Sequence, residues 1–136
     1  MAAHTLVDVS SFAWSPDGTR LAFMGIIEGE TSDLYLHDFN SGETTRLTDG
    51  SSQGIRPSWS PDGRWIVHTG VSSLGTGAGF GMEGIWAAAA DGSSVQALYP
   101  LETSSGDEII HGWLSPQEFV VSTWNAVFGE HALRSY

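Results

Sequence analysis

The sequence contains no cysteine and no lysine. Without cysteine the chain can form no disulfide framework and can supply no thiol for catalysis. Its five basic residues are all arginines, and they face 16 acidic residues, which gives a net charge of −11. This surplus of negative charge repels phosphate backbones, so we expect no nucleic-acid partner.

Long apolar runs are also missing. No run approaches the roughly 20 residues that a helix needs to cross a bilayer, so we expect no membrane insertion. Residues 1–6 lack a basic segment followed by an apolar one, and no signal peptide is visible. If the chain is part of a longer protein, this last point says little about its compartment.

A short motif, Trp-Ser-Pro-Asp-Gly, occurs at 14–18 and again at 59–63, which is 45 residues later. A partial third copy occupies 113–116. Proline presets φ, aspartate can bond its own backbone, and glycine accepts a left-handed conformation, so the motif predicts a tight turn between two strands. A period of this length with about four strands per unit is typical of a propeller blade.

The pattern resembles the WD-like repeat of TolB-type β-propellers, which is also found in the propeller domains of prolyl oligopeptidase and dipeptidyl peptidase IV-type enzymes. Residues 57–63 match Pro-x-Trp-Ser-Pro-Asp-Gly without a gap, and residues 34–38, 41–42 and 46–48 supply the rest of the first unit. The resemblance implies an all-β fold built from blades of four antiparallel strands. For a longer parent protein it also implies a periplasmic or extracellular location.

We expect one partial β-propeller over residues 1–136, with blades at about 11–48, 55–99 and 108–136. The third blade lacks a closing strand, which residues 4–10 of another copy are placed to supply. Since propellers use about four to eight blades, these three cannot close a ring. Either two copies associate into a six-bladed ring, or the chain is a fragment of a longer propeller. Open blade edges favour self-association as a dimer in both cases.

The sequence shows no recognisable catalytic or cofactor-binding pattern. There is no Gly-x-Ser-x-Gly nucleophile motif and no closely spaced histidine pair, so we expect neither enzymatic activity nor a cofactor. The glycine-rich stretch 75–81 is followed by no helix signal and no lysine, which argues against a phosphate-binding loop. We expect it to lie in a loop insertion at 71–82.

Repeat positions also suggest packing roles. Trp14, Trp59 and Trp113 share one position, and large rings at such a position are expected to pack between adjacent blades. His68 occupies the position that Phe23 holds in the first unit, and it is expected to face a blade interface.

One face of the predicted propeller gathers candidate partner-binding residues. Loops between successive blades, and between the second and third strands of each blade, share this face. The candidates are acidic, aromatic or otherwise polar: Glu28, Glu30, Arg56, Phe80, Met82, Glu83, Asp107, Glu108, His111, Trp124 and Glu130. An acidic rim with aromatic tips suits a protein or peptide partner. A cation near His111 is a further hypothesis, because carboxylates lie close to it in sequence.

The resemblance points to a non-catalytic module that serves as a protein–protein interaction scaffold. The alternative is the accessory propeller of a prolyl oligopeptidase-type serine peptidase, with its hydrolase domain outside this chain. A carbohydrate- or cation-binding propeller is a third possibility. Because a fold hosts many functions, the repeats alone do not decide between these.

Overall fold

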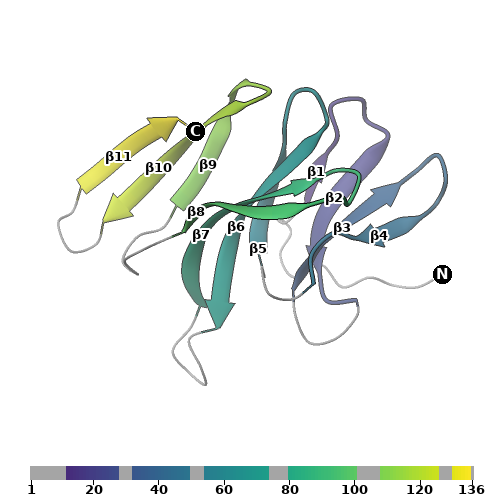
Figure 1. Cartoon of the computed structure of the whole chain (residues 1–136), viewed down its shortest axis with the longest axis horizontal. Coiled ribbons are helices and arrows are strands. Elements are labelled where there is room, and N and C mark those ends of the chain that lie inside the picture. The colour runs from purple at the N-terminus through teal and green to yellow at the C-terminus, as the bar shows by residue number, and fades with distance from the viewer. Residues whose placement is uncertain are drawn as a thin grey trace.

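A computed structural model describes residues 12–27, 32–49, 54–73, 80–100, 108–125 and 130–135. These residues form three antiparallel sheets that stand next to one another (Figure 1). Every regular element among them is a strand. The predicted fold class, β-propeller blades of antiparallel strands, is confirmed.

Each sheet is a simple meander. Blade 1 consists of β1 (Phe12–Trp14), β2 (Arg20–Gly25), β3 (Asp33–Asp38) and β4 (Thr44–Arg46) in that order. Blade 2 consists of β5 (Gly54–Trp59), β6 (Trp65–Ser73), β7 (Phe80–Ala89) and β8 (Val95–Pro100). Blade 3, over its described residues, consists of β9 (Glu108–Ser115), β10 (Glu118–Asn125) and β11 (Glu130–Ser135).

The repeated motif forms the turn between the first two strands of blades 1 and 2. In blade 1 the Ser15 hydroxyl donates to Asp17 Oδ1 at 2.6 Å and accepts the N–H of Arg20 at 2.9 Å. Ser60 makes the same pair of hydrogen bonds, to Asp62 at 2.6 Å and from the N–H of Trp65 at 2.9 Å. The serine and aspartate therefore close the turn that proline and glycine permit.

The prediction of a loop over residues 71–82 is wrong at both ends of that segment, because strands extend into it. β6 continues to Ser73 and β7 begins at Phe80, with Val71 opposite Met82 and Ser73 opposite Phe80. A register shift between Gly70 and Val71 lets the ladder continue past the length of the other blades. The paired backbone hydrogen bonds outweigh the low strand propensity of the glycines here.

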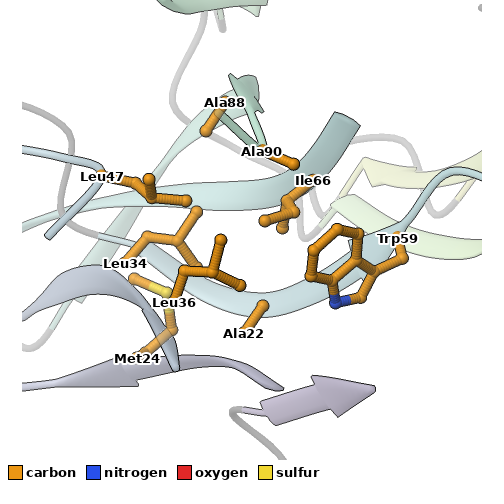
Figure 2. Close-up of a cluster of buried hydrophobic side chains, with 9 residues drawn as sticks. All are labelled: Ala22, Met24, Leu34, Leu36, Leu47, Trp59, Ile66, Ala88 and Ala90. Carbon is orange, nitrogen blue, oxygen red and sulfur yellow. The ribbon is translucent and has the colours of Figure 1, made fainter. Parts of the chain in front are cut away.

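Two apolar cores hold the blades together. Residues from blades 1 and 2 form the first core: Ala22, Met24, Leu34, Leu36, Leu47, Trp59, Ile66, Ala88 and Ala90. Figure 2 shows Ile66, Ala88 and Ala90 lying across from Ala22, Leu34 and Leu36. Val67, Ile85, Ala87, Phe119 and Val121 form the second core, between blades 2 and 3. Ile66 and Val67 thus serve opposite interfaces, as alternation along a strand requires.

Candidate functional site

Two of the repeated tryptophans join adjacent blades, as predicted. The ring of Trp59 is only 6% exposed, and its Nε1 donates to the carbonyl of Ala13 in blade 1 at 3.0 Å. Trp113 repeats this arrangement, because its Nε1 donates to Ser58 Oγ in blade 2 at 3.1 Å. Each indole therefore reaches the innermost strand of the blade before it.

Trp14 holds the same repeat position but lies in a different environment. It is 50% exposed and stacks on Phe39 of its own blade, with ring centroids 5.1 Å apart. Phe39 and Phe12 are also exposed. The rings of His37 and Phe39 form a T-shaped pair with their centroids 4.6 Å apart. The prediction that Trp14 packs between two blades is therefore wrong for the described residues.

These four side chains define what we call the blade-1 outer face: Phe12, Trp14, His37 and Phe39. Ala13 packs on the core shared with blade 2, so its neighbours along β1 point to the opposite side of the sheet. The outer face is thus the side of blade 1 turned away from blade 2.

The predicted rim residues are placed as follows. Phe80, Met82 and Glu83 lie in the first part of β7, Glu108 begins β9, Trp124 lies near the end of β10, and Glu130 begins β11. Because connections in a meander alternate between the two ends of a sheet, these positions lie at the end opposite the Ser-Pro-Asp-Gly turns. Glu28, Glu30 and Asp107 lie outside the described residues.

Arg56 and His111 complete that predicted set. Arg56 is exposed in β5 with a φ of 57°, in the irregular stretch between Ile55 and Ser58. His111 is exposed in β9, and its Nε2 lies 2.7 Å from Ser122 Oγ on the neighbouring strand β10. The histidine is thereby held against the sheet by a hydroxyl partner.

His68 is fully buried in β6, opposite Trp86 of β7. It lies two residues after Ile66, and alternation places both on the blade 1 side of the strand. The prediction that His68 faces a blade interface is confirmed.

A buried carboxylate that the sequence did not single out lies inside blade 1. Asp33 is 0% exposed; its Oδ2 accepts from Arg46 Nη2 at 2.8 Å and its Oδ1 from the Thr48 hydroxyl at 2.8 Å. Thr48 in turn accepts the N–H of Leu34 at 3.0 Å. Because both carboxylate oxygens are engaged by groups of the same blade, this cluster ties β3 to the end of the blade and offers no reactive atom.

Within the described ranges, no group of three or more histidine, aspartate or glutamate residues is arranged to hold a metal ion. The same part of the chain contains no helix that is long and apolar enough to cross a membrane.

Two pockets open beside the turns. The first, of about 240 Å³, lies between blades 1 and 2 and is lined by Arg20, Gly63, Arg64, Trp65, Ala89, Ala90, Asp91 and Ser93. The second, also about 240 Å³, lies between blades 2 and 3 and is lined by Trp65, Val67, Ala87, Gln96, Leu98, Trp113, Pro116, Gln117 and Phe119. Sequence reasoning missed Arg20 and Arg64, although each closely follows the glycine of a repeated turn.

The sheets, turns and tryptophan contacts together define a protein made of β-propeller blades. No protein-family model matches the chain. It is 33% identical to a protein of Agrobacterium tumefaciens assigned to TolB, whose structure superposes with a TM-score of 0.61 over 90% of this chain and 42% of that one. The chain is therefore similar to TolB proteins in both sequence and propeller fold.

Peptidases carry similar repeats. The chain is 45% identical over 64 residues to the uncharacterized peptidase YuxL of Bacillus subtilis. This matched segment makes up 47% of this chain and 9% of the peptidase. An acylaminoacyl peptidase of Pyrococcus horikoshii shares the fold at 16% identity, with a TM-score of 0.55 over 98% of this chain and 25% of that one.

An uncharacterized protein of Agrobacterium fabrum is 35% identical over 105 residues, or 71% of this chain, and the match spans 33% of that relative. The chain thus spans a third or less of the length of these two curated relatives.

Proposed function

We propose that the chain is a non-catalytic β-propeller module that serves as a protein–protein interaction scaffold. The observation that carries this proposal is the 50% exposure of Trp14, beside Trp59 at 6% in the same repeat position. An exposed pair of stacked aromatic rings, with Phe12 next to it, is the composition that protein interfaces favour. The resemblance to TolB, a protein named for the Tol-Pal system, supports a role alongside other proteins.

The partner that fits the blade-1 outer face is another propeller blade. Trp59 and Trp113 each donate their indole N–H to the innermost strand of a preceding blade. Trp14 has the same side chain at the same position in its turn, so it suits an innermost strand with an acceptor in reach. In a longer protein that blade belongs to the same chain. For the isolated chain, a second copy supplies it.

Sedimentation velocity over a range of protein concentrations tests this proposal. We expect the wild-type chain to form a dimer and Trp14→Glu to remain a monomer, because a carboxylate would be buried against an apolar blade. Gln117→Glu adds the same charge at an exposed turn of blade 3 and should still dimerise. A wild-type chain that stays monomeric at every concentration would defeat the proposal for the isolated chain.

The accessory propeller of a serine peptidase is a second candidate, favoured by the 45% identity to a peptidase of Bacillus subtilis. The two candidates differ in what the rest of the gene encodes. The peptidase reading requires a downstream hydrolase domain with Gly-x-Ser-x-Gly; the scaffold reading requires none. Either reading is compatible with a periplasmic or extracellular location, which we propose from the TolB resemblance.

A further inference from the structure

The pocket between blades 1 and 2 gathers positive charge in a strongly acidic chain. Two of the five basic residues, Arg20 and Arg64, line it, while the whole sequence carries a net charge of −11. We propose that this pocket binds the carboxylate of an acidic peptide, with the two guanidinium groups as the recognition elements. The pocket lies on a different surface from the blade-1 outer face, so this inference and the proposed function can fail separately.

Arg20 is held in place before any ligand arrives. Its guanidinium carbon lies 4.9 Å from the centroid of the Trp59 ring, and its Nη2 donates to the carbonyl of Gly63 at 3.3 Å. Stacking on an indole restricts the guanidinium plane but leaves its other N–H groups able to donate hydrogen bonds. A preorganised fork of this kind loses little entropy when it binds a planar carboxylate.

Arg64 adds a second, exposed guanidinium from the next turn along. The only ion pair among the described residues joins Arg46 to Asp33, so neither Arg20 nor Arg64 has a carboxylate within 4.0 Å there. Asp91 also lines the pocket, but its Oδ1 accepts the N–H of Ser93 at 2.9 Å. Hydrogen bonds from the Ser93 hydroxyl and N–H lower the pKa of Asp91, with a smaller contribution from the charge of Arg64.

The size and surroundings of the pocket favour a peptide as the source of the carboxylate. A volume of about 240 Å³ admits one side chain or chain terminus rather than a folded surface. Trp65, Ala89 and Ala90 give this pocket an apolar wall beside the two arginines. Such a wall suits a ligand with a carboxylate and an apolar group side by side, which free phosphate lacks.

Matched peptides provide the test. The probes are N-acetyl-aspartyl-leucinamide, its neutral counterpart N-acetyl-asparaginyl-leucinamide, and inorganic phosphate, each titrated while the backbone amide signals of Gly63, Arg64, Ala90 and Ser93 are followed by NMR. We expect the aspartyl peptide to shift these signals and to bind about tenfold or more tightly than the asparaginyl peptide, because only the former makes charge-assisted hydrogen bonds.

Three variants locate the effect. Arg64→Gln should weaken the aspartyl peptide about tenfold or more. Arg20→Lys keeps the charge but loses the planar fork, and it should weaken binding to a smaller extent. Arg56→Gln removes an exposed arginine outside the pocket and should leave binding unchanged. Equal binding of the two peptides, full binding by Arg64→Gln, or a response to phosphate without a response to the aspartyl peptide would each overturn the assignment.

Discussion

At the scale of single residues, the two Ser-Pro-Asp-Gly turns hold their carboxylates with different sets of donors. Asp17 Oδ1 accepts from the Ser15 hydroxyl at 2.6 Å, the Thr19 hydroxyl at 2.9 Å and the Thr19 N–H at 3.0 Å. Asp62 Oδ1 accepts from the Ser60 hydroxyl at 2.6 Å and the Arg64 N–H at 3.2 Å. Arginine in place of threonine removes one hydroxyl donor from the second turn.

These hydrogen bonds, led by that from Ser15, lower the pKa of Asp17 from 3.8 to about 2. Because the folded state favours the charged form, the contribution of this turn to stability is complete above pH 3.8 and is lost as the pH falls toward 2. We expect Asp17→Asn to lower the melting temperature at neutral pH. The variant should also lose less of its melting temperature than the wild type between pH 3.8 and about 2. Thermal melts of both proteins across the range measure the difference.

A carboxyl NMR titration provides the check on this prediction. Asp17 should titrate near pH 2. The pKa of Asp62 is also lowered, chiefly by the Ser60 hydroxyl, and its midpoint should lie above that of Asp17 because it has fewer donors. An Asp17 midpoint at the ordinary value of an exposed aspartate would show that the hydrogen bonds do not persist in solution.

At the scale of elements, the turns could be predicted from sequence because proline and glycine determine the local backbone conformation. The strand order could be predicted because the motif repeats at the length of one propeller blade. Alanine favours a helix, yet Ala87, Ala88 and Ala89 lie in β7, because pairing with the neighbouring strands overrides that propensity. The extension of β6 and β7 was missed, since it depends on a register shift after Gly70 that no local pattern encodes. The environment of Trp14 was missed for the same reason: identical motifs differ in what packs against them.

Gly70 tests the importance of close packing within the β6–β7 pair. A Cβ at this position would lie 2.6 Å from both Cδ1 and Nε1 of the Trp86 ring. We expect Gly70→Ala to destabilise the chain by about 1–3 kcal/mol, because a rigid indole must move or the ladder must distort. Urea denaturation followed by circular dichroism gives the change in free energy of unfolding.

The double variant Gly70→Ala with Trp86→Leu identifies the cause. If the clash with the indole is responsible, Gly70→Ala should lower the free energy of unfolding less in the Trp86→Leu background than in the wild type. An equal cost in both backgrounds would place the effect in the backbone of β6 instead.

At the scale of the whole molecule, the blades form an array in which each interface joins neighbours. β9 of blade 3 contacts β5, β6 and β7 of blade 2, while β1 and β2 of blade 1 contact β5. The sequence could predict that tryptophans occupy these interfaces, because their position recurs. It could not predict the pocket beside the turns, since Arg20 and Arg64 line it together only after blades 1 and 2 pack against each other.

An array of this kind should loosen one interface at a time. Trp113→Ala removes the hydrogen bond to Ser58 and the contact with Phe119, whose ring centroid lies 5.2 Å away. We expect amide hydrogen exchange to become faster in β9 and β10 and to stay unchanged in β2 and β3. Ile26→Ala, which truncates an exposed side chain of blade 1 outside the outer face, is the control and should leave exchange in blade 3 as it is. A uniform rise across all three blades after Trp113→Ala would instead mean that the chain unfolds as one cooperative unit.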